Sequence, residues 1–363
     1  MFRFIRYALI IGSLSLAFFL LAPLAGASEC SFFLWDQLVP DQDVLTRASA
    51  CRAESESQIE AFALPSEFDD TLFGRRVYAR LADNALVYPE PSGGVAPVRN
   101  VGDGFLFATV NSWDEVNGAT WYQINHGEYV HEEDIQLVTV SDFQGVEVLR
   151  QPERPFGWIV QDVQPSSQPD GESNPSYAEL PRFTFFEIYD AAIGQDDWIW
   201  YDIGNGRWIR QTYVSVVDAS PRPDEVDPDE FWTEVDLYEQ TFAAYEGDRM
   251  VYATLISSGL NRWPTREGLF QVWQRFGEYK MSGAEGKVDY YFLEDVPYIM
   301  YFDQLNSIGL HGTYWHDRYG YKHSHGCVNM PILDAEWTFN WSADAPNDLW
   351  VWVHTSDATN IFN

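Results

Sequence analysis

Positive charge is scarce in this chain. Its 363 residues carry 22 Lys and Arg against 55 Asp and Glu, which gives a formal net charge of −33. Such a field repels phosphate backbones, so we expect no nucleic-acid partner. The simplest interpretation of the excess acid is a soluble surface that faces an extracellular medium, although a cationic partner stays open.

Long apolar runs are also scarce, because only the N-terminus contains one. Residues 1–27 combine two early Arg with an apolar run over 8–24 and the small-residue triplet Ala25-Gly26-Ala27. This order is typical of a cleaved signal peptide, and an uncleaved anchor is the alternative. Pro23 and the small residues favour cleavage. We therefore expect a secreted or cell-envelope protein.

Cysteine occurs only three times. Cys30 and Cys51 lie close together after the signal segment, and they could form a disulfide in an oxidising compartment. Residues 28–72 around them carry little apolar pattern and are expected to form an N-terminal cap. That pairing leaves Cys327 as a lone thiol near the other end of the chain.

Aromatic residues, in contrast, are abundant: 15 Trp, 20 Tyr and 24 Phe make up 16% of the chain. Together with short apolar alternations between turn residues, they predict a mainly β protein of several domains. The alternations begin near Val77, as in Gly104 to Val110 and Trp121 to Ile124. Strands this short and close together predict a small barrel.

An internal repeat predicts a second barrel. Trp121 to Val138 and Trp200 to Val217 align without a gap, sharing Trp-Tyr, then Ile, then Gly in a hairpin turn. The repeat resembles the tail of bacterial SH3-like modules, which implies one module over 73–140 and another over 141–220. In the second, Gln164 to Pro181 is expected to be an exposed insertion. Two unrelated hairpins with a chance match are the alternative.

A third, larger β domain is expected over 230–356, after a stiff linker of Pro and acidic residues at 221–229. Its opening residues Trp232 to Leu237 alternate like a strand, and 240–257 read as a hairpin turning at Gly247. Near its end, Pro331 predicts a helix beginning at Ile332.

The reactive side chains concentrate in His311 to Asn329, where four of the seven His and Cys327 lie. A Cys attacks a carbonyl as thiolate, and a His can accept the thiol proton and return it later. Gly326 lets the backbone approach a substrate, and the amides of Gly326 and Cys327 are candidates for an oxyanion hole. A buried structural Cys and a zinc site are alternatives, but the His spacing fits no usual zinc pattern.

These residues resemble the signature of YkuD-type L,D-transpeptidase catalytic domains: His311-Gly312-Thr313, Gly320 and Ser324-His325-Gly326-Cys327-Val328-Asn329. Ser257-Ser258-Gly259 with Pro264-Thr265 and Gly268 resembles another part of the family's pattern. Arg266 and Asn329 depart from it. The resemblance implies a β-sandwich with a short helix after the catalytic Cys, a nucleophile at Cys327 and a base at His311. It implies no metal and no cofactor.

Further site residues follow from the same segment. Supporting or oxyanion roles are expected for Gly326, Ser324 and His325. The candidates for substrate binding are Tyr298, Gly312, Thr313, Trp315 and Asn329, with an aromatic core role open for Tyr298 and Trp315. Arg318 and Lys322 could meet a substrate carboxylate, although exposed loop charges are the simpler explanation.

The function that the resemblance implies is an exported acyltransferase acting on peptidoglycan stem peptides. Cys327 would form a thioester with the stem, and an amine of a neighbouring stem would resolve it into a cross-link. Two alternatives remain: an L,D-carboxypeptidase that uses water, and a non-catalytic wall-binding protein. Cell-wall binding by the SH3-like modules and a monomeric state are further expectations.

Overall fold

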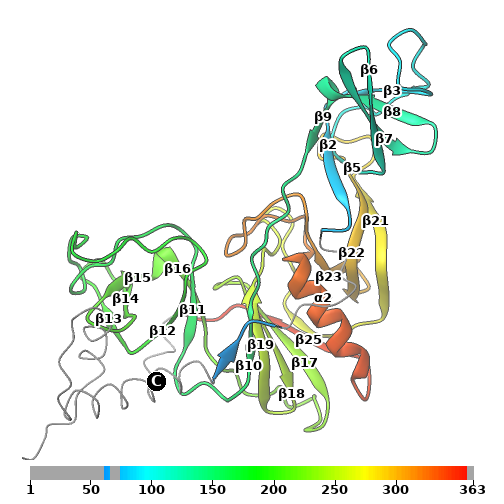
Figure 1. Cartoon of the computed structure of the whole chain (residues 1–363). Helices are drawn as coiled ribbons and strands as arrows, with labels where there is room; N and C mark the ends of the chain where they lie inside the picture. Colours follow the sequence, from blue (N-terminus) through cyan, green and yellow to red (C-terminus); the bar gives the residue numbers. More distant parts are fainter. Residues whose placement is uncertain (1–60, 66–73, 358–363) are drawn as a thin grey trace, which may run out of the picture. The chain divides into compact units, whose positions relative to one another are not determined.

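The computed structural model describes residues 61–65 and 74–357 (Figure 1). The expected signal peptide, the Cys30–Cys51 pairing and most of the cap lie outside the described residues. Within the described ranges no helix is both long and apolar enough to cross a bilayer. Strands dominate, as expected, and the one α-helix of the described part is α2, Ile332–Trp341, where Pro331 predicted a helix.

The first copy of the repeat contributes strands to two sheets. Strand β2 pairs with β5 and β9, while β4, β3, β8, β7 and β6 form the other sheet in that order. The bounds are β2 Val77–Leu81, β3 Leu86–Tyr88, β4 Arg99–Asn100, β5 Phe105–Val110, β6 Ser112–Val116, β7 Ala119–Asn125, β8 Glu128–His131, the 3-10 turn η2 Glu132–Asp134 and β9 Ile135–Leu137.

The second copy repeats this plan almost element for element. Strand β11 pairs with β12 and β16, and β13, β14 and β15 form the other sheet. A constant shift of 79 residues, which takes Trp121 to Trp200, also takes η2 onto η3. The bounds are β11 Phe156–Ile159, β12 Phe185–Glu187, β13 Asp190–Ile193, β14 Ile199–Asp202, β15 Trp208–Arg210, η3 Gln211–Tyr213 and β16 Val214–Val217. Chance similarity of two hairpins does not explain this agreement.

The segment Gln164 to Pro181 is not an insertion, which corrects the sequence prediction. The same shift places it over the segment that contains β3 and β4 in the first copy. Ser166 bridges Trp208, as Tyr88 of β3 pairs with Tyr129 of β8. The segment makes isolated bridges but no regular strand. Its sequence has no alternating apolar pattern, so it did not look like part of a sheet.

Each copy has a hydrophobic core of its own. In the first copy it contains Leu81, Val87, Ile124 and Val130, and in the second Ile159, Tyr201, Ile209 and Val216 are among its members. Separate cores are what independent small barrels require. The two copies are therefore related units.

The remaining strands lie in two larger sheets, and the second of these also contains β5, β2 and β9. The first has the order β1-β10-β19-β18-β17-β25-β20, and the second has the order β24-β23-β22-β5-β2-β9, with β21 beside β22. The bounds are β1 Phe62–Ala63, β10 Val146–Val148, β17 Phe231–Asp236, β18 Thr241–Glu246, β19 Arg249–Leu255, β20 Gly268–Gln271, β21 Gln274–Gly283, β22 Tyr291–Asp303, β23 Ile308–Gly312, β24 Val328–Met330, η4 Ser342–Asp344 and β25 Trp350–His354. The predicted opening strand and hairpin are confirmed as β17 and β18–β19.

Both large sheets take strands from outside 230–356. Strand β10 pairs with β19, and β5 of the first repeat pairs in parallel with β22. Tyr78 of β2 stacks on Tyr314 with ring centroids 3.7 Å apart, and both belong to the same core as Val235 and Phe242. The sheets therefore continue across the borders that the sequence pattern indicated.

Helix α2 is anchored by one buried carboxylate. Asp334 Oδ1 accepts hydrogen bonds from Tyr252 Oη at 2.6 Å and from the Gly145 amide at 2.9 Å. Its Oδ2 accepts a bond from Thr254 Oγ1. One side chain thus joins the helix to β19 and to the segment before β10.

Asp334→Ala is expected to destabilise the protein by about 3 kcal/mol, because it leaves three buried donors without an acceptor. Asp334→Asn keeps an acceptor oxygen and is expected to lose about 1 kcal/mol. Urea unfolding at fixed pH measures both values. Equal stability of the Ala variant and the unaltered protein would contradict the anchoring role.

Candidate active site

Cys327 and His311 line one cleft of about 420 Å³. The strands that carry them are parallel neighbours, with His311 of β23 opposite Asn329 of β24. Of the residues expected at the site, six line this cleft: Cys327, His311, Ser324, His325, Trp315 and Asn329. The fold therefore brings together the pair on which the predicted chemistry depends.

His311 is oriented by its own backbone neighbour. Its Nδ1 lies 3.0 Å from the Gly312 carbonyl oxygen, which can only accept, so Nδ1 carries the proton and Nε2 is free to act as a base. The ring is 2% exposed, and this burial lowers the pKa of His311 to about 4. The imidazole is consequently neutral, and able to accept a proton, at neutral pH.

Cys327 follows a glycine in an unusual conformation, since Gly326 has a φ of +122°. The thiol keeps part of its surface open to the cleft, yet burial among protein atoms raises its pKa to about 11. An amide hydrogen bond from Gly309 offsets part of this rise. Sγ lies 4.0 Å from the Ser307 carbonyl oxygen, an acceptor that suits a neutral thiol. The resting pair is thus thiol and imidazole, not thiolate and imidazolium.

Alkylation of Cys327 by iodoacetamide is expected to become about tenfold faster per pH unit between pH 7 and pH 9, with no plateau. The raised pKa leaves a thiolate fraction on the order of 10⁻⁴ at pH 7, and this fraction grows with pH. Stopped-time mass spectrometry of the labelled protein measures the rate. A plateau already reached at pH 6 to 7 would instead reveal a thiolate–imidazolium pair.

Ser324 organises the loop that carries the nucleophile. Its Oγ accepts a hydrogen bond from the Gly326 amide at 3.0 Å and donates one to the Cys327 carbonyl oxygen. The Gly326 amide, one of the two expected candidates for an oxyanion hole, is engaged by the first of these bonds.

Thr265 and Gly259 stabilise the same loop through a second set of hydrogen bonds. Thr265 Oγ1 donates to the Gly326 carbonyl oxygen at 2.7 Å and accepts from the Gly259 amide at 2.9 Å. A Cβ on Gly259 would lie 2.2 Å from the Trp263 carbonyl oxygen and 3.0 Å from the Gly326 Cα. Gly259 and Thr265, which belong to the second part of the family pattern, thus pack directly against the residue before Cys327.

Three of the expected substrate-binding residues do not line the cleft. Tyr298 is buried and donates to Glu336 of α2 at 2.6 Å, so it belongs to the core. The carbonyl oxygen of Gly312 accepts the hydrogen bond that orients the His311 ring. Thr313 is fully buried, and its amide donates to the Met330 carbonyl oxygen. Their sequence neighbourhood suggested substrate contact, but their side chains or backbone groups are engaged inside the protein.

Trp315 and Asn329 remain cleft residues. The Trp315 ring lies 5.6 Å from that of His311 and forms a wall. The side-chain amide of Asn329 lies 2.8 Å from Nε2 of His316, whose Nδ1 accepts from the Arg318 amide. His325 is exposed and packs on Trp263, with ring centroids 3.8 Å apart.

Sequence reasoning missed one cation at this site. Arg262 lines the cleft and stacks on Trp263, and its guanidinium is 4.0 Å from Asp289. Arg318 and Lys322, the cations suggested by the sequence, line a different cavity. No neighbour of Arg262 in the sequence marks it, because its place depends on the loop between Gly259 and Thr265. Over residues 61–65 and 74–357, no group of His, Cys, Asp or Glu is arranged to hold a metal ion.

Comparison with known proteins supports the assignment of this domain. Residues 230–353 match the family described as the YkuD L,D-transpeptidase catalytic domain. A Bacillus subtilis (strain 168) protein named "Putative L,D-transpeptidase YciB" is 30% identical over 121 residues, 30% of this chain and 59% of the relative. The chain thus matches little more than half the length of that relative.

Solved structures of the same kind were also found. The catalytic domain of an Enterococcus faecium L,D-transpeptidase is 27% identical, with 35% of this chain and 98% of that one covered and a TM-score of 0.31. An L,D-transpeptidase from Mycobacterium smegmatis is 16% identical, with 50% and 76% covered and a TM-score of 0.32. Residues 230–353 of this chain are thus similar to L,D-transpeptidase catalytic domains of the YkuD type.

Proposed function

We propose that this protein is an exported cysteine L,D-transpeptidase that cross-links or remodels peptidoglycan stem peptides. The observation that carries the proposal is the pairing of Cys327 with an oriented, neutral His311 in one cleft of the catalytic domain. A nucleophile and a base in one cleft meet the basic requirement of acyl transfer.

In the first half of the reaction, Cys327 attacks the carbonyl of the stem peptide bond. Its thiol proton passes to Nε2 of His311 as the S–C bond forms, which fits a thiol that is protonated at rest. The tetrahedral intermediate collapses, His311 returns the proton to the leaving amine, and a D-amino acid departs. A thioester on Cys327 remains.

In the second half, the amine of a neighbouring stem attacks the thioester and gives up its proton to His311. The new amide bond forms, the C–S bond breaks, and the proton restores the thiol of Cys327. The amide of Cys327 is the remaining candidate for the oxyanion donor, since the Gly326 amide is engaged. The bond energy of the original peptide drives the exchange, so no nucleotide is required.

Arg262→Gln is expected to raise KM for a stem tetrapeptide about tenfold with little change in kcat. Arg262 is the one Arg or Lys lining the cleft, and its exposed pair with Asp289 is weak enough to yield to a substrate carboxylate. Steady-state kinetics measures the effect, and Arg249→Gln, a β19 surface variant, is the matched control. An unchanged KM would contradict this role.

Transfer and hydrolysis share the same acyl-enzyme, so an L,D-carboxypeptidase is the alternative. Apolar residues on one side of the cleft, among them Phe105, Tyr291 and Leu293, favour transfer because they limit water. The test is to incubate the enzyme with stem tetrapeptide and analyse products by mass spectrometry. A cross-linked dimer supports transfer, trimmed tripeptide alone supports hydrolysis, and unchanged substrate contradicts both.

We also propose that residues 1–27 are a cleaved signal peptide and that the protein works in the cell envelope as a monomer. The compositional pattern of the N-terminus supports export. The two repeated units are proposed to be SH3-like modules over 73–140 and 141–220 that bind the cell wall, and the separate core of each copy supports this. N-terminal sequencing of the secreted protein tests the cleavage, which should leave Ser28 first.

A further inference from the structure

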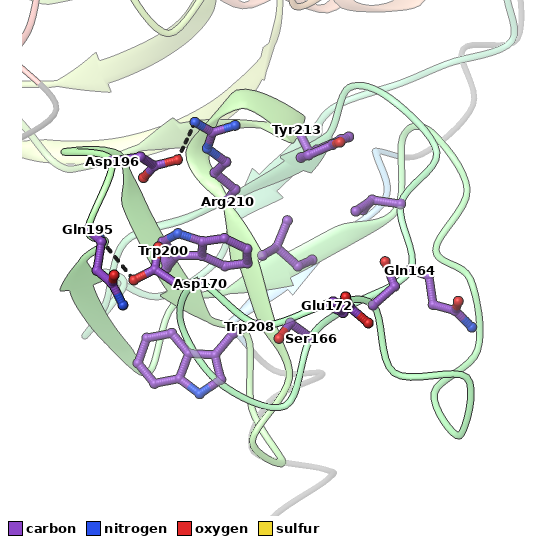
Figure 2. Close-up of a pocket in the computed structure, with 14 residues that line it drawn as sticks. Gln164, Ser166, Asp170, Glu172, Gln195, Asp196, Trp200, Trp208, Arg210 and Tyr213 are labelled. Atoms are coloured by element: carbon purple, nitrogen blue, oxygen red, sulfur yellow. Dashed lines mark hydrogen bonds and ion pairs between the residues drawn. The ribbon is translucent and has the colours of Figure 1, made fainter.

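The second repeat contains a cavity of its own. It measures about 850 Å³ and lies between the outer face of the β14–β15 hairpin and the segment that corresponds to β3–β4. Figure 2 shows Trp200 and Trp208 on the hairpin side and Glu172 with Gln164 on the facing segment. Nothing in the proposed reaction uses this cavity.

Comparison of the two copies explains why the cavity exists. In the first copy, Trp121 is 5% exposed, and the ring of Tyr88 packs against it edge-on at 5.2 Å. In the second copy, the residue that pairs with Trp208 is Ser166, where Tyr88 pairs with Tyr129. The loss of this aromatic ring leaves Trp200, the counterpart of Trp121, partly exposed in a hollow.

Two donors in this cavity have no partner in the protein. Nε1 of Trp200 and Nε of Arg210 are both buried, and neither makes a hydrogen bond within the described structure. Both groups can only donate, so neither is satisfied within the described structure. An unpaired buried donor costs free energy, which a bound molecule with suitable oxygens would recover.

The charges of the cavity limit what that molecule can be. The Arg210 guanidinium is already paired with Asp196 at 2.6 Å, and Asp170 and Glu172 add two further carboxylates. One oxygen of Asp170 accepts from the Gln195 amide at 2.9 Å, as the dashed line in Figure 2 marks. A net negative lining disfavours phosphates and carboxylates and favours a neutral ligand.

We propose that this cavity binds a neutral saccharide that carries hydroxyl or acetamido oxygens. Sugar hydroxyls would donate to Glu172, and small side-chain shifts would open Trp200 Nε1 and Arg210 Nε to sugar oxygens. The indole faces of Trp200 and Trp208 offer flat apolar surfaces to the C–H face of a pyranose ring. The proposal rests on the wall-binding role proposed for this module, but the site is independent of the chemistry proposed for Cys327, so either can fail alone.

The test is titration of the full chain with an uncharged N-acetylglucosamine tetramer, followed by calorimetry. We expect binding at micromolar to millimolar concentration, at least tenfold weaker in Trp208→Ala and severalfold weaker in Trp200→Phe, which keeps a ring but lacks the donor. Trp113→Ala, an exposed Trp of the first repeat, is the control and should bind as the unaltered chain does.

Absence of binding at millimolar tetramer would overturn the proposal, and so would equal binding by all three variants. Binding of a lysine-containing stem peptide in the same cavity, lost in Trp208→Ala while the tetramer does not bind, would assign the site to a cationic peptide and reject the saccharide. The alkylation rate of Cys327 should be unchanged in every variant. That readout separates this site from the cleft.

Discussion

Cys327→Ala is expected to lower the rate of cross-linked product formation by about 10⁴-fold or more, to the background level. The account assigns both covalent steps to this sulfur, and no other Cys lies in the described structure. The cleft retains His311 and Arg262 in the variant, so substrate binding is expected to persist. A purified-enzyme assay with stem tetrapeptide measures the rate.

A matched variant separates loss of the nucleophile from loss of the fold. Cys327→Ser preserves the volume and the backbone of the loop, but a hydroxyl next to a His of low pKa is a much weaker nucleophile. It should be nearly as inactive as the Ala variant, with an unchanged unfolding midpoint. Full product formation by either variant would show that another residue is the nucleophile.

His311→Gln is expected to lower kcat/KM about 10³-fold, in the range attributed to a positioned general base. Because the Cys327 thiol is protonated at rest, attack requires a base at the moment of bond formation. Gln can occupy the ring's place and cannot take the proton. Steady-state kinetics over pH 4 to 9 measures the effect.

The dependence of kcat/KM on pH tests directly whether His311 is the base. Burial lowers the pKa of His311 to about 4, so kcat/KM of the unaltered enzyme should be lost only as the pH falls through that value, where the base becomes protonated. The His311→Gln variant should lack this acid limb while its slow alkylation by iodoacetamide keeps the same pH slope. A variant that retains both the rate and the acid limb would show that His311 is not the base.

The sequence predicted local structure well, because each of those signals lies within a few neighbouring residues. Alternation at Trp232, the turn at Gly247 and Pro331 before α2 each specify a single element. The repeat was visible because Trp, Ile and Gly recur at the same places in both copies. Cys327 and His311 stood out because their motif is compact.

What the sequence could not predict depends on strands meeting across long separations. The pairing of β5 with β22 joins segments nearly 190 residues apart, and no local pattern encodes it. The hydrogen bond from the Gly326 amide to Ser324 could not be predicted, because it depends on the rotamer of Ser324. Arg262 enters the cleft through a loop conformation, and the segment at Gln164 resembled an insertion because it had lost its strand pattern.

The most direct test of the account is the intact mass of the protein during turnover with stem tetrapeptide. We predict a single adduct equal to the tetrapeptide minus its terminal D-amino acid, located on Cys327 by peptide mapping and discharged when an acceptor amine is added. The adduct should be absent from Cys327→Ala. Product formation without any adduct on Cys327, or with an adduct elsewhere, would contradict the central claim.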